Sequence, residues 1–315
     1  MKSIFTGFMY LYFHLRTRPL QTVGLIISLF SILMILIGPS IIPYSPTNGV
    51  DMQLLPPSAK FWFGTDVNGM CVFSRTMAAY RTDLAIVLVG AVLSLALGLP
   101  LGIISGYFDG QKGLLGKVST FLLRTMDVFQ SFPIFVLGLL LVAIFGPNWI
   151  NLMLLIAIAN LPANLRMART GVLSIRNNNF VDAARVAGSS ELRIAFVHIA
   201  PNVLSPVIAL LSVVMGFGIL LVAGLSFVGA GVRAPTPEWG AMIAQGSTTM
   251  MTGEWWPSLF PGFFMALTVF GFSMVGDIIT AMTDPLQRIG LRNSLEGWRQ
   301  NRTAATAKKT VLNKA

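Results

Sequence analysis

The chain has 315 residues, of which 54% are hydrophobic and only 11% are charged, whereas soluble globular domains carry about 25% charged residues. A mean hydropathy of +0.73 argues against a soluble fold, because a chain of this size cannot hide so much apolar surface from water. The net charge of +10 is distributed between long apolar runs, which argues against nucleic-acid binding and is typical of a membrane protein. The single cysteine, Cys71, excludes an intrachain disulfide and a cysteine-based metal site.

Six membrane spans are predicted in chain order, since about 20 consecutive apolar residues cross a bilayer. The first is interpreted as a retained anchor, because its uncharged run from Leu20 to Ile42 is too long for the core of a cleaved signal peptide. Gly146-Pro147-Asn148 divides one long apolar stretch into a third and a fourth span joined by a tight hairpin. The predicted spans cover residues 20–38, 84–108, 121–145, 149–167, 204–229 and 257–281.

Lysine and arginine residues sort unevenly between the two sides that these spans define. Eighteen fall on the side that holds both termini, and four fall on the other side. Because cytoplasmic loops carry the excess of basic residues, both termini are predicted to be cytoplasmic. Residues 286–315 then form a basic cytoplasmic tail, predicted to be disordered from Arg299 onwards.

Two long segments on the opposite side, residues 39–83 and 230–256, are rich in proline, glycine and aromatic residues. We interpret Trp239, Trp255 and Trp256 as an aromatic belt at the membrane surface, with contact to an external partner as the alternative. Inside the spans, charges are expected in pairs or at helix ends. Arg124 and Asp127 can share one helix face near the start of the third span, and they are predicted to form an ion pair at the membrane interface, with a substrate or proton role as the alternative. Asp277 is predicted to close the sixth span.

No catalytic motif is present, and the chain is predicted not to be an enzyme. Gly110 to Lys117 (GQKGLLGK) resembles a phosphate-binding loop, but its spacing is one residue too long and Val118 replaces the magnesium-binding Ser or Thr. The chain is therefore predicted to hold no nucleotide and no cofactor. It also has too few buried ionisable groups for a proton-driven carrier.

The segment from Phe180 to Asn202 is far longer than a helix hairpin needs. Its alanines predict a short helix that stops at Gly188, and Ser190 is predicted to cap a second short helix. Phe180, Ala184 and Ala187 are expected to share one apolar face. Such a helix suits docking into a groove on a partner, with an unpartnered surface helix as the alternative.

The pattern Asp182-Ala183-Ala184-x3-Gly188-x9-His198-Ile-x-Pro201 resembles the cytoplasmic loop of ATP-binding-cassette (ABC) importer permeases, with Asp182 in place of the usual Glu. More narrowly, residues 15–290 resemble the second permease of the dipeptide, oligopeptide and nickel uptake group. The further matches are Phe63-Gly64-Thr65-Asp66, Val72-Phe73-Ser74-Arg75, Ser131-Phe132-Pro133, Leu225-Ser226-Phe227-Val228-Gly229-Ala230-Gly231, Pro235-Thr236-Pro237-Glu238-Trp239-Gly240-Ala241-Met242 and Gly276-Asp277…Asp284-Pro285.

This resemblance implies an all-α, polytopic type-1 ABC importer permease fold in a bacterial cytoplasmic membrane. It implies an N-terminal segment at 1–60, a permease core at 61–285 with a coupling loop at 170–202, and the tail at 286–315. The implied partners are a homologous second permease, two cytoplasmic ATPase subunits that bind ATP and magnesium, an external solute-binding protein and the lipid bilayer. The residues implied to couple the chain to the ATPase are Asp182, Ala183, Ala184, Gly188, Glu191, His198 and Pro201.

The implied function is import of peptides or a related small solute by alternating access. The chain departs from the family where Met70-Cys71 replaces the usual Arg-Asp pair, and where uncharged residues follow Asp277. Both departures remove charge, and they leave the solute open. The alternatives are a self-contained channel or secondary carrier without an ATPase, and a membrane scaffold without transport.

Overall fold

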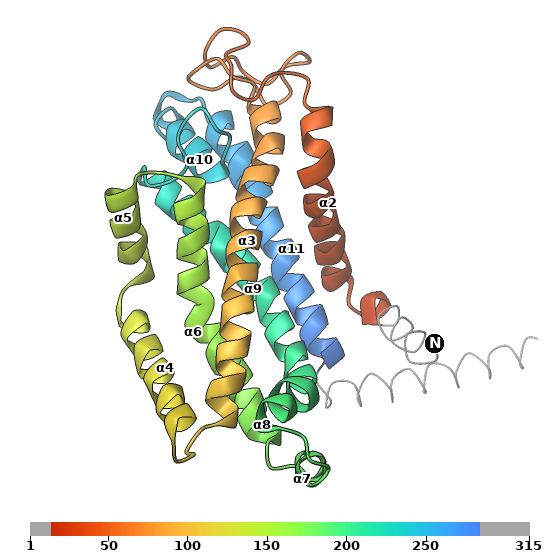
Figure 1. Ribbon diagram of the computed structural model, residues 1–315. Coiled ribbons are helices and arrows are strands. Elements are labelled where there is room, and N and C mark those ends of the chain that lie inside the picture. Colours follow the sequence, from red (N-terminus) through yellow and green to blue (C-terminus); the bar gives the residue numbers. More distant parts are fainter. Residues whose placement is uncertain (1–13, 284–315) are drawn as a thin grey trace, which may run out of the picture.

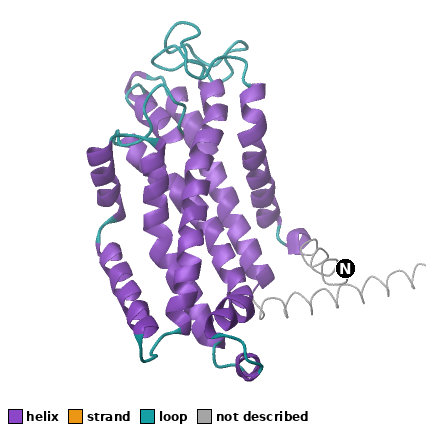
Figure 2. Cartoon of the chain, in the orientation of Figure 1, coloured by secondary structure: helices purple, strands orange, loops and turns teal. Residues whose placement is uncertain are grey.

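Long helices account for most of residues 14–283, which are the residues that the computed structural model describes (Figure 1). Within this range there is no β-strand, only an isolated bridge between Thr65 and Cys71 (Figure 2). The predicted all-α class is therefore confirmed. The predicted tail at 286–315 and the Asp284-Pro285 motif lie outside the described residues.

Five helices in the described range are long and apolar enough to cross a membrane. They are α2 (Pro19–Ile41), α3 (Val72–Tyr107), α6 (Trp149–Ile175), α9 (Ala200–Phe227, continuous with the turns from Glu191) and α11 (Trp256–Thr283). Each contains most of a predicted span, but the helices extend further than the apolar runs. Helix α3 has 36 residues, about 54 Å at 1.5 Å per residue, which exceeds the roughly 30 Å of hydrocarbon in a bilayer. Helix α11 likewise continues six residues past Asp277, which is exposed within the helix rather than at its end.

The predicted third span, 121–145, is not one continuous helix. It is divided into α4 (Leu114–Ser131) and α5 (Ile134–Phe145), which are bent by 85° relative to each other. Phe132 is extended, with φ −82° and ψ 130°, because a residue before proline is pushed out of the helical region. Counting this bent pair as one span gives up to six spans, which is the predicted number.

The predicted ion pair within α4 is also wrong. Asp127 Oδ1 lies 2.6 Å from Nη2 of Arg166 on α6, and Arg124 takes no part in the pair. The sequence places Arg124 and Asp127 three residues apart on one helix. It could not show that Arg166 of α6 lies at the same height in the bundle as Asp127.

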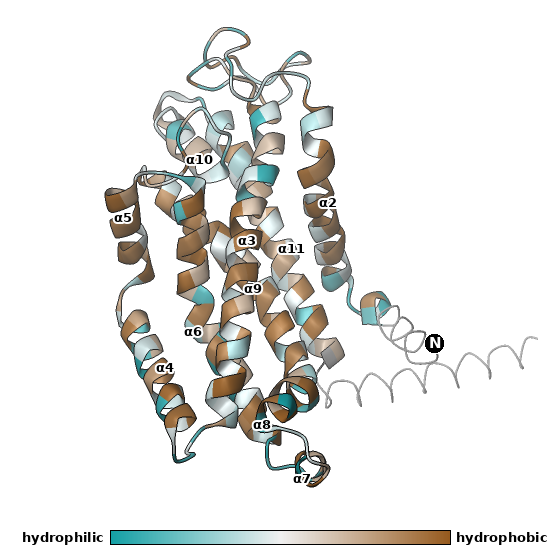
Figure 3. Cartoon of the chain, in the orientation of Figure 1, coloured by the Kyte–Doolittle hydropathy of each residue, from teal (hydrophilic) through white to brown (hydrophobic). Residues whose placement is uncertain are grey.

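Helix α3 lies at the centre of the bundle and packs most closely against α6 (Figure 1). The close approach depends on small residues: a side chain at Gly90 or Gly106 would place its Cβ 2.7 or 2.8 Å from a carbonyl oxygen of α6. Apolar residues cover the outward faces of α2, α5 and much of α4 (Figure 3), as expected for helices in contact with lipid.

The two ends of the bundle carry different structures (Figure 1). One end carries the α3–α4 loop, α7 (Asn179–Val186), α8 (Glu191–Arg193) and a π-helical turn, Ile194–Ile199. The opposite end carries residues 42–71 and 228–255, which we call the cap and which include α10 (Trp239–Ser247) and a short 3₁₀ turn, Met250–Thr252. Helix α2 begins, and α11 ends, on the α7 side.

The aromatic-belt interpretation of the cap is wrong for two of its three tryptophans. Trp239 and Trp256 are buried, and only Trp255 is exposed. The indole nitrogen of Trp239 donates to the carbonyl of Thr76 at 3.1 Å, and that of Trp256 donates to the carbonyl of Thr65 at 3.0 Å. These two side chains therefore fasten the cap to the bundle, with their N–H groups satisfied inside the protein.

Candidate coupling site

Helix α7 is held against the bundle by one apolar side chain. Val181 is fully buried in a cluster at the α7 end of the molecule, and Ala184 packs at the edge of that cluster. The other members come from α3, α6, the π-helical turn and the start of α9, and include Ile103, Val172, Ile194, Ile199 and Val203. The predicted apolar face is wrong in detail, since Phe180 and Ala187 are exposed. Helical spacing predicts which residues of α7 lie on the same side, but contacts with the bundle determine which side is buried.

The predicted stop at Gly188 is present as a Schellman motif. Gly188 has φ +81°, a left-handed conformation that suits glycine. Its N–H donates to the carbonyl of Arg185 at 3.0 Å, and the N–H of Ser189 donates to the carbonyl of Ala184 at 3.1 Å. Gly188 therefore ends α7 and reverses the chain toward α8.

The second short helix is not separate. Residues from Glu191 continue through the π-helical turn into α9, and they form one long candidate span that ends at Phe227. The Ser190 side chain makes no capping hydrogen bond, although its carbonyl accepts from the N–H of Ile194 at 2.9 Å. The π-helical turn, Ile194–Ile199, ends two residues before Pro201. Proline has no N–H to donate to the hydrogen bonds of a regular helical turn. The segment that follows α7 therefore leads directly into a membrane span.

A polar network ties α7 to the end of α3. Nη1 of Arg185 lies 2.9 Å from Asp182 Oδ1, and Nε lies 3.0 Å from Glu191 Oε1. The Tyr107 hydroxyl donates to the Glu191 carboxylate, and Nη2 of Arg185 donates to the Tyr107 oxygen at 3.3 Å. The hydrogen bonds to Glu191 and Tyr107 raise the pKa of the Arg185 guanidinium above its ordinary value.

The structure brings together five of the seven predicted coupling residues: Asp182, Ala183, Ala184, Gly188 and Glu191. His198 and Pro201 lie further along, in the π-helical turn and at the start of α9. The sequence reasoning missed Val181, Arg185 and Tyr107. Arg185 had a usable signal, because it follows Asp182 by three residues on a helix. Tyr107 had none, because it is 84 residues away from Glu191 along the chain.

Large apolar side chains near this network remain exposed at the α7 end. Val186 is 91% exposed, and four others on the same segment are uncovered: Phe180, Leu192, Phe196 and Val197. A cluster of exposed apolar residues of this size marks a contact surface for another protein or for the membrane.

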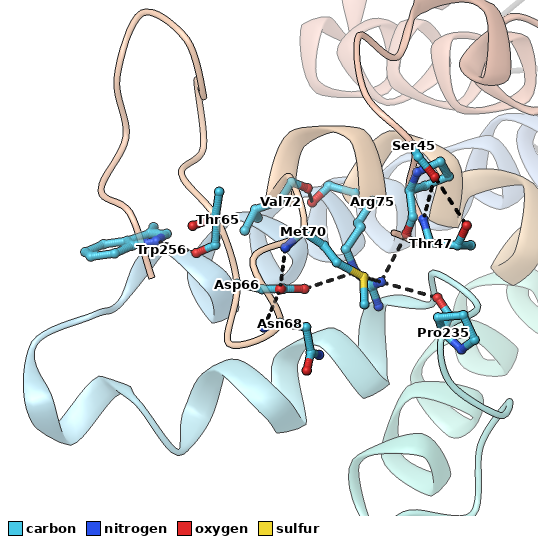
Figure 4. Close-up of polar contacts among 12 residues, drawn as sticks. Ser45, Thr47, Thr65, Asp66, Asn68, Met70, Val72, Arg75, Pro235 and Trp256 are labelled. Carbon is cyan, nitrogen blue, oxygen red and sulfur yellow. Dashed lines mark hydrogen bonds and ion pairs between the residues drawn. The ribbon is translucent and has the colours of Figure 1, made fainter. Parts of the chain in front are cut away.

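The cap is organised around a buried arginine (Figure 4). Nη1 of Arg75 on α3 donates to the carbonyls of Pro46 and Pro235 at 3.0 and 3.2 Å and lies 2.6 Å from the Met70 sulfur. Its Nε lies 3.4 Å from Asp66 Oδ2. Arg75 thus joins α3 to both segments of the cap, and Met70 has a structural contact there.

A second buried polar cluster fixes α10. The Glu238 carboxylate caps this helix by accepting from the N–H groups of Gly240 and Ala241 at 2.8 and 2.7 Å. Asp83 Oδ2 on α3 accepts from the N–H of Trp239 at 3.1 Å. Burial raises the pKa of Glu238, although the two N–H groups oppose this shift. The prediction of few buried ionisable groups is therefore wrong for the cap, where Asp66, Arg75, Asp83 and Glu238 are all buried.

Comparisons with known proteins agree with the fold. Residues 98–289 match the family described as the inner membrane component of binding-protein-dependent transport systems. The chain is similar in fold to the MetNI methionine ABC transporter in inward-facing conformations, with a TM-score of 0.52, 19% identity, and coverage of 64% of this chain and 94% of the other.

Curated relatives are similar over most of the chain. The probable D,D-dipeptide transport system permease protein DdpC of Escherichia coli is 36% identical over 273 residues, covering 86% of this chain and 89% of the relative. The dipeptide transport system permease protein DppC of Alkalihalophilus pseudofirmus is 37% identical, with 86% and 87% covered. The nickel transport system permease protein NikC of Escherichia coli is 35% identical, with 87% and 96% covered.

Systems of this family combine a multi-pass inner-membrane component with an ATPase and a binding protein. The helical bundle, the predicted motifs and these relatives agree with one another. The chain therefore belongs to the family of inner membrane components of binding-protein-dependent transport systems, and it is a transmembrane permease subunit of an ABC importer.

Proposed function

We propose that this permease imports short peptides or a related small solute, and that α7 with its Gly188 turn receives the motion of a cytoplasmic ATPase. In this proposal two ATPase subunits bind ATP and magnesium, and a homologous second permease completes the path. The termini and the α7 end face the cytoplasm, in keeping with the excess of lysine and arginine on that side. The peptide assignment is supported by the dipeptide relatives, and the nickel relative keeps a metal solute as the competing candidate.

The observation that carries the coupling assignment is the way α7 is attached. Val181 and the Arg185 network hold the helix to α3 and to the start of α9, while the opposite side of α7 stays exposed. A partner that moves α7 therefore moves the end of a membrane span through direct contacts. ATP can shift the transporter between its inward-facing and outward-facing states because ATP binds one of these states more tightly than the other.

Charge introduced at Val186 tests this assignment. Its side chain makes little contact with its own chain, so Val186→Asp should leave the fold intact while it places a carboxylate in the interface with the ATPase. We expect the variant to lose co-purification of the ATPase in mild detergent and to lose ATP-dependent uptake. Met251, which is 93% exposed on the cap, provides the matched control: Met251→Asp should retain the ATPase. Retention of the ATPase and of uptake by Val186→Asp would refute the assignment.

A further inference from the structure

Helix α4 exposes two chemically different faces. A polar stripe follows one side of the helix at alternating spacings of three and four residues, and all its members are exposed: Lys117, Thr120, Arg124, Asp127 and Ser131. Spacing of this kind places side chains on one helix face. The next face around the helix is apolar and includes Leu114, Phe121 and Val128, of which the last two are 70% and 61% exposed. Only Gly116, Ser119 and Met126 are buried against the bundle. An apolar face suits lipid, but the polar stripe requires a different environment.

The stripe runs along α4 from the cytoplasmic end of the bundle towards the membrane. Asp127 is ten residues beyond Lys117, which is about 15 Å along α4 at 1.5 Å per residue. Asp127 and Arg166 are 54% and 45% exposed on the outside of this single chain. A charge within hydrocarbon costs about 2.5–3.5 kcal/mol on insertion scales and usually faces a bundle interior or a water-filled cavity. Asp127 lies inside the predicted third span, 121–145, and Arg166 lies next to the end of the predicted fourth span, 149–167. The pair is therefore at the cytoplasmic border of the hydrocarbon, where water or polar neighbours suit this side of α4 better than lipid tails do.

The cytoplasmic end of the stripe opens into a hollow of about 680 Å³ between the α3–α4 loop and the first turns of α4. Its lining includes Lys112, Lys117 and Thr120, and also Phe121 of the apolar face. Two members of the stripe thus border an open space at the surface that we assign to the cytoplasm. The hollow brings water to the cytoplasmic end of the stripe, and the charges of Arg124 and Asp127 distinguish the polar side of α4 from its apolar side.

The wall formed by the stripe and Arg166 carries more positive than negative charge. Lys117, Arg124 and Arg166 are basic, and Asp127 is the one acidic member. Asp127 is neutralised by Arg166 at 2.6 Å, whereas Arg124 takes part in none of the ion pairs found within residues 14–283. In a narrow cavity with low-dielectric walls, such a surplus concentrates anionic groups and repels cations.

We propose that the polar stripe of α4, together with Arg166, forms one wall of a water-filled solute path, and that its basic surplus favours a solute with a free carboxylate over a hydrated metal cation. This inference rests on the proposed function and adds to it the location of the path and the chemical class of the solute. A short peptide carries the required carboxylate at its C-terminus.

Thiol accessibility tests the location of the path in the complete transporter. The single native cysteine is buried, so a Cys71→Ala background leaves only introduced thiols. Cysteines at Thr120 and Ser131 sample the stripe, and one at Val128 samples the apolar face as the matched control. Because water must reach a thiol for the reactive thiolate to form, we expect the stripe cysteines to react with a charged thiol reagent at least about tenfold faster than the control. Equally slow reaction at all three sites, from burial under lipid or under a partner subunit, overturns the proposal.

Charge reversal at Arg124 tests the solute class. Arg124→Glu leaves the Asp127–Arg166 pair in place, and it should lower uptake of a zwitterionic dipeptide by roughly tenfold, the scale of one charge interaction in a partly dry site. Arg124→Lys, which keeps the charge, should restore uptake. Co-purification of the ATPase should be normal in both variants, which separates failure of this inference from failure of the coupling assignment. Unchanged dipeptide uptake in Arg124→Glu overturns the charge preference.

Discussion

Gly188 offers the sharpest test of how α7 is coupled to the rest of the chain. Its φ of +81° is left-handed, and a Cβ added there would meet no atom within 4 Å. The cost of Gly188→Ala is therefore backbone strain alone, about 1–2 kcal/mol. Gly188→Asn should cost less, because asparagine tolerates this conformation. Gly188→Pro should abolish the turn, because proline fixes φ near −65° and loses the N–H that donates to Arg185.

This strain is a sizeable fraction of the free energy from the contacts that hold α7. Full burial of a valine such as Val181 contributes about 1.5–3 kcal/mol. The half-exposed ion pairs of Arg185 add about 0–1 kcal/mol each. A loss of 1–2 kcal/mol changes an equilibrium by about 5- to 30-fold. Gly188→Ala should therefore leave α7 undocked for a measurable fraction of the time.

The assay is the number of ATP molecules hydrolysed per solute imported by the complete transporter in proteoliposomes. Gly229 supplies the control, since it has φ +87°, no atom within 4 Å of an added Cβ, and an N–H that donates to Ser226 at 3.0 Å. Gly229→Ala introduces the same strain on the cap side of α9. We expect both alanine variants to lower thermal stability equally, and only Gly188→Ala to raise the ATP consumed per solute. Equal coupling in the two variants would refute the reasoning.

Three further predictions concern the buried side chains that hold each end. Val181→Ala should lower the stability of α7 docking by about 1–2 kcal/mol and speed proteolysis between residues 176 and 190, whereas Val186→Ala on the exposed side should not. Arg75→Met should lower the free energy of unfolding by about 3–5 kcal/mol, because Asp66 stays buried without an opposite charge and keeps only the N–H groups of Asn68 and Met70. Thermal unfolding in detergent would show this, with Arg75→Lys less affected. Because burial raises the pKa of Glu238 above its ordinary 4.5, the folded chain holds this proton more tightly than the unfolded chain. Stability should therefore fall as pH rises above about 4.5, and Glu238→Gln should flatten that slope in pH-dependent melting curves.

The membrane spans were predictable because a bilayer demands long apolar runs, whatever the rest of the fold does. The ends of the helices were less predictable, because Arg75 and Asp83 precede the uncharged run that starts at residue 84 although both lie within α3. Only their buried partners in the cap explain why the helix continues through them. The break at Phe132-Pro133 had a local signal, since a residue before proline resists the helical conformation.

At the coupling site, the position of the turn was predictable and the attachment of the helix was not. Gly188 ends α7 for a local reason, namely the left-handed conformation that the turn requires. The choice of Val181 over Phe180 as the buried anchor depends on how α7 lies across α3 and the start of α9. That geometry comes from residues far apart in the chain, such as Tyr107 and Glu191, and no spacing within the segment encodes it.

The two ends of the permease are held by different physical means, and the difference fits their roles. At the cap end, Arg75 of α3 is buried beside Asp66, and Glu238 is buried where it accepts from two backbone N–H groups. Removing one partner of a buried ion pair such as Arg75–Asp66 is strongly destabilising. At the α7 end, one valine and a few half-exposed ion pairs form the attachment, so α7 can shift at a small cost in free energy. In the coupling that we propose, Val181 and the Arg185 network are the contacts through which motion of α7 reaches the ends of α3 and α9. The firmly fixed cap would stay in place during that motion, so the movement would be confined to the spans.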